Sequence, residues 1–421
     1  MGKHKKHPSE HCQQKIRQLQ HKNEFAKRLK AFATAYMGKE AAALLTHERL
    51  EDIYAIRMHT IKMVVADGSV IEPGDRKYVE AFMLNRIKDL KIAAPDGSEV
   101  PFSEYLTVGL SLSFYITRTT HHSQTENDPF FKAFAGYKDL FYSGEEACKR
   151  LYYLANDICY FINEIGVEHF WIDANLKFKM SDDKTILPYL ELHREVPEKH
   201  TFIIDNESRH GFRVGWSRPI SGVEYIKLKP SELGMNGNSP DTPMDIYIQA
   251  HALQRLEERL DCLPKELVHF CMILSLIQPR FTHDGHGKFL FEYWFDKYKP
   301  GYLLANIVDG CILIRTFLFL TNSGTPEGQK LEKMTGLGKL DKKYLAIDKL
   351  STFMATDIRP NEAVMKLLHE SGCESLVDLI EDVTDIIQNK NFNHHTGAML
   401  SRYLELNKVA EKELLEKLAE M

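Results

Sequence analysis

The stretch Tyr247-Ile-Gln-Ala-His251-Ala-Leu-Gln-Arg255-Leu-Glu-Glu258-Arg259-Leu260 has the period of an amphipathic α-helix. At about 100° per residue, one side of this helix carries His251, Arg255, Glu258 and Arg259. The other side is apolar and consists of Leu253, Leu256, Leu260 and Leu263. The pattern predicts a helix whose leucines pack on a sheet. The side with His251, Arg255, Glu258 and Arg259, called the polar front, faces away from the sheet.

The polar front carries residue types that suit metal-free cleavage of RNA. An imidazole, which gains and loses its proton near neutral pH, moves a proton from the attacking 2'-hydroxyl or to the leaving oxygen. Guanidinium groups stabilise the negative charge that builds on phosphate. The structural alternative is an ion pair between Glu258 and Arg255, with His251 making a hydrogen bond at the helix start, since charge pairs at this spacing are common.

Runs with a period of two surround this helix and predict strands. The strands expected before it are residues 170–178, 186–192, 201–204, 211–216 and 223–228. The strands expected after it are 289–295, 302–308 and 311–320, beyond a second helix that Pro264 opens. Short gaps imply antiparallel connections, and Asp309-Gly310 suits a tight hairpin turn.

Both ends of the chain have a helical pattern. Residues 11–165 predict four to six helices, and residues 362–369, 376–388 and 398–418 predict three more. The first helix is basic, with nine Lys or Arg against two Glu between Lys3 and Lys30. Such a charge run is either the solvated face of a packed helix or a surface that grips RNA or a membrane.

We therefore expect an α+β protein in three parts. Residues 1–165 form a helical domain with a basic N-terminal helix, and residues 166–355 form an α+β domain with a central antiparallel sheet and packed helices. Residues 356–421 form a helical C-terminal segment. A chain of 421 residues is long enough for two or three domains.

The composition predicts a cytoplasmic protein without a membrane segment. Seven scattered cysteines, never in a C-x-x-C pair, indicate free thiols. The N-terminus lacks the apolar core of a secretory signal, and Arg315 interrupts the longest apolar run. The net charge of −5 gives no protein-wide attraction to nucleic acid.

Residues 245–353 resemble small ribonuclease toxins of the barnase and RelE-like fold. The resemblance covers about a quarter of the chain and rests on a helix, a second helix and a set of strands, with a His-Ala-x-x-Arg-x-x-x-Arg pattern at His251, Ala252, Arg255 and Arg259. It implies that the helix packs on the sheet and that polar residues of later strands complete the site. Arg315 and Thr316 are the positions that fit this role, and the alternative for Arg315 is a salt bridge from the strand to the helix, for instance to Glu258.

The loop after residue 320 is a second place where phosphate can bind. Thr325 and Pro326 are suited to open a helix, and exposed amides at a helix start hold phosphate with help from the Ser323 and Thr325 hydroxyls. The alternative is a plain connection in which Thr325 serves as a cap. The loop lacks the Gly-Lys-Ser/Thr ending of a P-loop.

Histidines occur in loose pairs, at His121-His122, His283-Asp-Gly-His286 and His394-His395, without a second ligand pair at a recognised distance. We expect no metal and no cofactor. The leading hypothesis is a toxin-related ribonuclease with His251, Arg255, Arg259 and Arg315 as catalytic residues and Glu258, Thr316, Ser323 and Thr325 as substrate-binding residues. The runner-up is a non-catalytic interaction or scaffold protein with a degenerate toxin-like domain, because the 14 basic and 13 acidic residues over 245–349 leave a balance of only +1. The candidate partners are accordingly RNA and an inhibitor or partner protein, and the oligomeric state is left open.

Overall fold

A computed structural model describes residues 10–93, 97–120, 128–135, 145–166, 168–181, 185–235, 241–283, 287–354 and 362–388. The chain forms two compact units. The first comprises Met1–Cys159 and Trp171–Arg194, and the second comprises Tyr160–Phe170 and Glu195–Met421. The basic residues before Glu10 and the helix expected over 398–418 lie outside the described residues.

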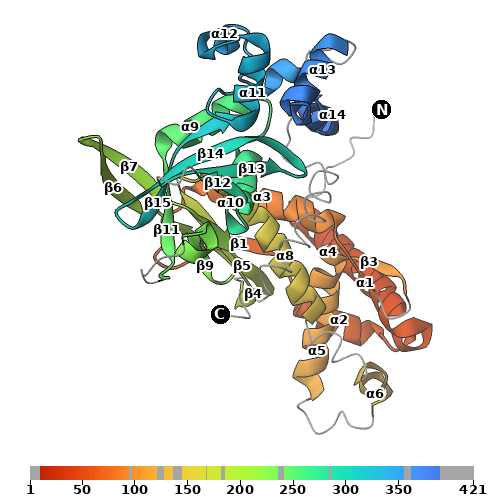
Figure 1. Ribbon diagram of the computed structural model, residues 1–421. Coiled ribbons are helices and arrows are strands. Elements are labelled where there is room, and N and C mark those ends of the chain that lie inside the picture. The colour runs from red at the N-terminus through yellow and green to blue at the C-terminus, as the bar shows by residue number, and fades with distance from the viewer. Residues whose placement is uncertain are drawn as a thin grey trace, which may run out of the picture. The chain divides into compact units, whose positions relative to one another are not determined.

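The first unit is mainly helical (Figure 1). Its helices are α1 (Glu10–Ala43, interrupted at Gly38), α2 (His47–Ala55), α3 (Pro73–Asp89), α4 (Phe102–Glu104), α5 (Leu110–Thr120), α6 (Pro129–Ala135) and most of α8 (Glu145–Ile162), with a π-helical turn over Tyr105–Gly109. Its strands are β1 (Lys62–Val65), β2 (Lys91–Ala93), β3 (Glu99–Pro101), β4 (His169–Met180) and β5 (Ile186–Glu195). β1 runs parallel to β5, and β5 also pairs with β4.

The second unit is built on an eight-stranded mixed sheet, in the order β12-β13-β14-β15-β11-β7-β6 with β10 paired to β11. Its strands are β6 (Lys199–Ile204), β7 (Glu207–Arg213), β10 (Lys227–Leu228), β11 (Met244–Gln249), β12 (Phe281–His283), β13 (Lys288–Phe295), β14 (Tyr298–Val308) and β15 (Cys311–Phe319). A separate ribbon pairs β8 (Gly215–Arg218) with β9 (Gly222–Tyr225).

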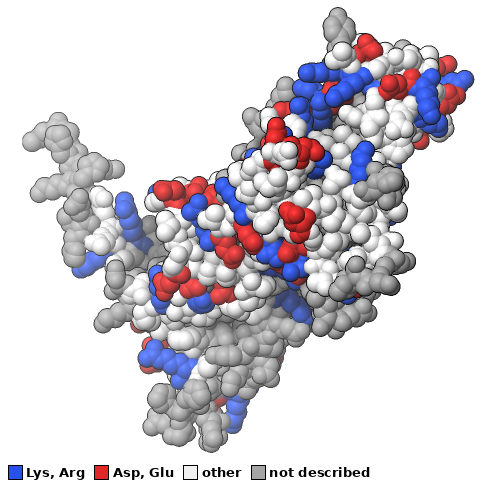
Figure 2. All heavy atoms as spheres, turned by 60° about the vertical axis from the view of Figure 1, so that its left-hand side comes forward, with Lys and Arg blue, Asp and Glu red and all other residues white. Residues whose placement is uncertain are grey.

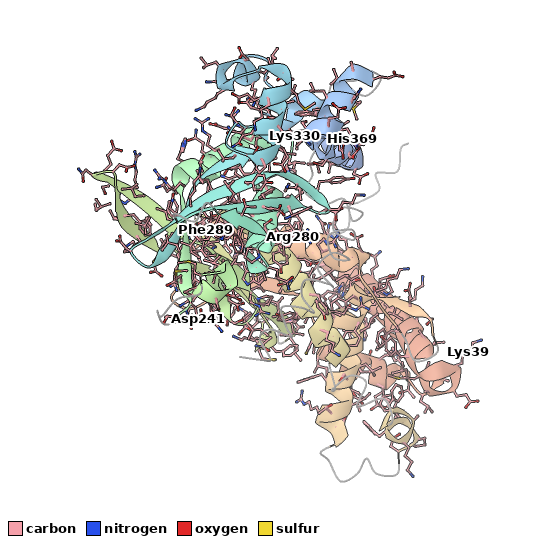
Figure 3. All side chains as sticks on the ribbon, in the orientation of Figure 1. Lys39, Asp241, Arg280, Phe289, Lys330 and His369 are labelled. Atoms are coloured by element: carbon pink, nitrogen blue, oxygen red, sulfur yellow. The ribbon has the colours of Figure 1, made fainter. Side chains whose placement is uncertain are left out.

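Helices cover this sheet and extend the unit beyond it. They are α9 (Ala250–Arg259), α10 (Lys265–Ile277), α11 (Pro326–Thr335), α12 (Lys339–Tyr344), α13 (Glu362–Ser371) and α14 (Ser375–Gln388), with 3-10 turns at Pro230–Leu233 and Leu350–Met354. α9 packs on β15, α10 on β13 and α14 on β14. α11 packs beside α13, and Figure 3 marks the two helices by Lys330 and His369.

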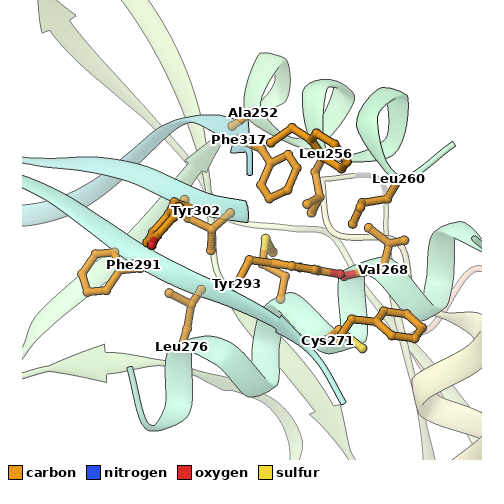
Figure 4. Close-up of a cluster of buried hydrophobic side chains, with 14 of the residues drawn as sticks. Ala252, Leu256, Leu260, Val268, Cys271, Leu276, Phe291, Tyr293, Tyr302 and Phe317 are labelled. Atoms are coloured by element: carbon orange, nitrogen blue, oxygen red, sulfur yellow. The ribbon is translucent and has the colours of Figure 1, made fainter. Parts of the chain in front are cut away.

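The main core lies between the sheet and helices α9 and α10 (Figure 4). Leu256 and Leu260 of α9 are completely buried, as are Phe291 and Tyr293 of β13. The hydroxyl of Tyr293 donates a 2.9 Å hydrogen bond to the carbonyl of Val268 in α10, so the one polar atom of this side chain is satisfied. The predicted apolar face of α9 is thereby confirmed.

The predicted α+β class is confirmed, and so are most expected elements. At Asp309 and Gly310 φ is 51° and 75°, as a tight turn of the primed type requires, and this turn joins antiparallel β14 and β15. The expected strand over 211–216 is instead divided between β7 and β8, and that over 223–228 between β9 and β10.

The expectation of one wholly antiparallel sheet is wrong for β5, which pairs in parallel with β1 in a separate sheet, and it is wrong again within the eight-stranded sheet. β11 runs parallel to β15, with Ile246 beside Ile312 and Ile248 beside Ile314. Parallel neighbours need a long crossover, and here α9, α10 and β12 to β14 supply it. The predicted helix accordingly begins at Ala250 and not at Tyr247, because residues 244–249 form the strand β11.

Candidate functional site

The polar side of α9 faces solvent. His251, the second residue of the helix, is exposed. Arg255 follows one turn later and donates from Nη1 to Glu258 Oε2 at 2.8 Å, and Gln254 Nε2 donates to Glu258 Oε1 at 2.8 Å. The side chains of Arg255 and Glu258 are 40% and 39% exposed. The expected pairing of Glu258 with Arg255 is confirmed. This ion pair is exposed to solvent, and Glu258 accepts hydrogen bonds from both Arg255 and Gln254.

Arg259 has a different environment from Arg255. Its guanidinium forms an ion pair with the carboxylate of Asp348 and also donates to the Asp348 main-chain carbonyl at 3.3 Å. The two side chains are only 18% and 12% exposed. This half-buried pair fastens the end of α9 to the segment that follows α12, so the guanidinium is already neutralised by a neighbouring carboxylate.

Arg315 points away from α9. Ile312 and Ile314 of β15 belong to the core that α9 covers, whereas Leu313 packs in a small cluster on the opposite face of the sheet. Arg315 Nη1 lies 3.5 Å from Asn306 Oδ1, and Asn306 stands opposite Leu313 in the ladder. Because cross-strand partners share a face, Arg315 lies on the face of Leu313.

A β-bulge lies at Arg315. Ile314 pairs with Ala305 and Thr316 pairs with Leu304, so Arg315 is the extra residue. Its second contact is Asp205 Oδ2 at 3.7 Å, in the turn between β6 and β7. The salt bridge suggested for Arg315 is therefore made to Asp205 and not to Glu258, and Thr316 is half-buried beside the bulge.

Thr325 has a structural role. It is completely buried, and its hydroxyl oxygen accepts from the Gly328 amide at 3.0 Å while donating to the Leu320 carbonyl at 2.6 Å. This is the capping role that the sequence offered as the alternative to phosphate binding. Ser323 is half-buried and accepts from Lys342 Nζ at 3.1 Å.

A polar network near the start of β14 was not predicted from the sequence. Lys299 Nζ lies 2.8 Å from Glu327 and 3.2 Å from Glu292, and it donates to the Tyr302 hydroxyl at 2.7 Å. Tyr302 in turn donates to Glu327 at 2.9 Å, and burial raises the pKa of Tyr302 to about 12. The network anchors the start of α11 to β14. Because Glu327 lies 25 or more residues from Lys299 and Tyr302 in the sequence, no local motif indicates the network.

Charges of both signs are interspersed over the face in Figure 2, without a continuous basic stripe. Within the described ranges, no three His, Cys, Asp or Glu side chains are grouped to hold a metal ion. His121, His122, His286, His394 and His395 lie outside those ranges. Cys148, Cys262, Cys311 and Cys373 are free thiols. None of the described helices has the length and apolarity to cross a bilayer.

The predicted catalytic set is thus divided by the sheet. His251, Arg255 and Arg259 belong to α9, whereas Arg315 lies on the opposite face of β15. Comparisons with protein-family models, curated proteins and solved structures found no match.

Proposed function

We propose that this chain is a non-catalytic interaction protein in which residues 245–353 form a scaffold of toxin-like architecture. The observation that carries the proposal is the position of Arg315 on the sheet face opposite α9. General acid–base catalysis requires the proton-transferring group and the charge-stabilising groups to reach one substrate atom. A sheet between them removes that convergence.

The ion pairs of α9 support the same proposal. Arg259 is engaged by Asp348 and Arg255 by Glu258, so a phosphate has to displace a carboxylate from each guanidinium. Displacing Asp348 is the costlier of the two, because that pair is largely shielded from water. These ion pairs therefore favour a structural role for Arg255 and Arg259 over phosphate binding.

A toxin-related ribonuclease is the second candidate, and one observation favours it. His251 is exposed at the start of α9, with half-exposed Arg255 one turn away on a helix that packs on a sheet. In this form the site is confined to the outer face of α9, with His251 as general acid or base and Arg255 as the phosphate ligand.

An RNA-cleavage assay separates the two candidates. The purified full chain is incubated with RNA in a chelator, beside His251→Ala and the matched control Gln254→Ala, which alters an exposed residue of the same helix. The proposal predicts intact RNA in all three samples. It is overturned if the wild type and Gln254→Ala cleave RNA while His251→Ala loses about 100-fold or more, the usual contribution of an acid–base group.

A further inference from the structure

The hairpin of β6 and β7 projects from the second unit as an exposed arm (Figure 1). Its tip is a two-residue turn at Asp205 and Asn206, where φ is 53° and 61°. Ile203 is 64% exposed, and the side chain of Asp205 is 86% exposed. A single exposed isoleucine is common on protein surfaces, so Ile203 supports a partner only together with the open edge of β6.

The outer edge of the arm has unpaired backbone groups. β6 ends the sheet order among the described strands, with β7 on its inner side. The Arg213 amide donates to the Glu198 carbonyl, and antiparallel partners alternate between bonded and non-bonded pairs. With this register, residues 200, 202 and 204 bond to β7, and the N–H and C=O groups of Lys199, Thr201 and Ile203 point outward.

We infer that β6 pairs in antiparallel fashion with β6 of a second copy of this chain. The register that sets Phe202 opposite its own copy places Ile203 beside Thr201 and Lys199 beside Asp205 of the second copy. Each Lys199 then lies near the Asp205 carboxylate of the other copy, which Arg315 of that copy contacts at 3.7 Å, and the two Ile203 side chains lie diagonally on one face. This inference deepens the proposed function by naming the partner.

The charges of the arm favour a second copy over a nucleic acid. Lys199 and Arg209 are balanced by Asp205 and Glu207, and all four are exposed. Arg209 is already paired with Glu207. RNA or DNA selects an excess of Lys and Arg, whereas a self-complementary strand needs opposite charges at its two ends.

The pairing is expected to be weak. A strand pair of six residues buries much less than the roughly 1,600 Å² of a standard interface. The dimer therefore forms in a concentration-dependent manner, and we expect its dissociation constant to lie in the roughly micromolar to millimolar range unless further surfaces contribute to the interface.

Sedimentation velocity of the full chain over that range tests the inference. The wild type is expected to shift from monomer to dimer, and Ile203→Lys to weaken the dimer at least about tenfold, which corresponds to about 1.4 kcal/mol. The matched control Val196→Lys alters a residue that is 70% exposed just before β6, and it should associate like the wild type. Thr201→Pro removes an outward N–H without touching the ladder to β7 and should also abolish the dimer.

The register has its own test. Lys199→Glu places two carboxylates together and should weaken the dimer, and adding Asp205→Asn, which tolerates the positive φ, should restore part of the loss. The inference is overturned if the wild type stays monomeric over the whole concentration range. It is also overturned if the single variants Ile203→Lys and Thr201→Pro both dimerise like the wild type. RNA cleavage in the same preparations reports separately on the proposed function, because it depends on His251 and not on β6.

Discussion

Arg255 and Arg259 stand one turn apart on α9, yet their ion pairs differ in burial. The Arg259–Asp348 pair is 18% and 12% exposed, whereas the Arg255–Glu258 pair is about 40% exposed on both sides. Removing one member of a shielded pair leaves the other charge uncompensated, and an exposed pair contributes little. The two arginines therefore form a matched comparison within one helix.

Arg259→Ala is expected to lower the free energy of unfolding by about 2–3 kcal/mol, and Arg255→Ala by less than about 1 kcal/mol. Urea unfolding followed by circular dichroism measures both. Equal losses in the two variants would contradict the structural role assigned to Arg259.

His169, at the start of β4, is a second residue with a defined energetic consequence. It is completely buried, and neither ring nitrogen has a hydrogen-bond partner among the described residues. Burial lowers the pKa of His169 from 6.5 to about 4, so the folded chain holds the ring neutral where the unfolded chain protonates it. Stability is therefore full above pH 6.5 and falls as the pH drops from 6.5 towards 4.

The His169 contribution to acid destabilisation is expected to be about 3 kcal/mol between pH 7 and pH 4. His169→Leu, which removes the titrating ring and keeps an apolar side chain, should lose correspondingly less stability over the same range. Urea unfolding at both pH values gives the comparison, and an unchanged pH dependence in the variant would refute the assignment.

At the level of elements, the start of α11 depends on close backbone packing. A Cβ added at Gly328 would lie 1.8 Å from the carbonyl oxygen of Asn322, in the same turn that Thr325 caps. A backbone atom moves far less easily than a side chain, so this position excludes any larger residue.

Gly328→Ala is expected to destabilise the second unit by more than about 3 kcal/mol. The control Gly74→Ala, in the first turn of α3, meets nothing within 4 Å and should be neutral or stabilising by up to about 1 kcal/mol. Thermal unfolding of both variants provides the measurement. A Gly328→Ala protein as stable as the wild type would show that the turn packs differently.

The elements also show what could be predicted from the sequence. The apolar face of α9, the β14–β15 hairpin and the Thr325 cap follow from local patterns, and the structure has them. β11 was missed because Ile246, Tyr247 and Ile248 are all buried in a central strand, which removes the alternation that marks a strand.

The candidate site was harder to predict because it depends on long-range geometry. Alternation after Ile314 puts Arg315 on the face of Leu313, and the bulge then returns Phe317 to the core, a change of phase that nothing in the local sequence marks. Asp348 lies 89 residues from Arg259, so their pairing has no signature on the helix. The sequence indicated which polar residues share one side of α9, but the convergence of Arg315 with them was an assumption.

At the scale of the whole molecule, the proposed partner binds the exposed edge strand β6 of the eight-stranded sheet. The β6–β7 arm belongs to the second unit, and its exposed Lys199 and Arg209 are balanced by Asp205 and Glu207. Exposed edges are usually blocked by charges or covered by other elements, so an edge that keeps Ile203 in water is expected to have a partner.

The most direct measurement of this claim is photo-crosslinking in living cells with a benzophenone amino acid in place of Ile203, compared with the same amino acid in place of Leu340. Leu340 is 80% exposed on α12, so both probes are accessible. If β6 pairs with a second copy of the chain, position 203 gives a protein adduct with twice the mass of the chain and position 340 gives none. No adduct at position 203, or equal adducts at both positions, would contradict it.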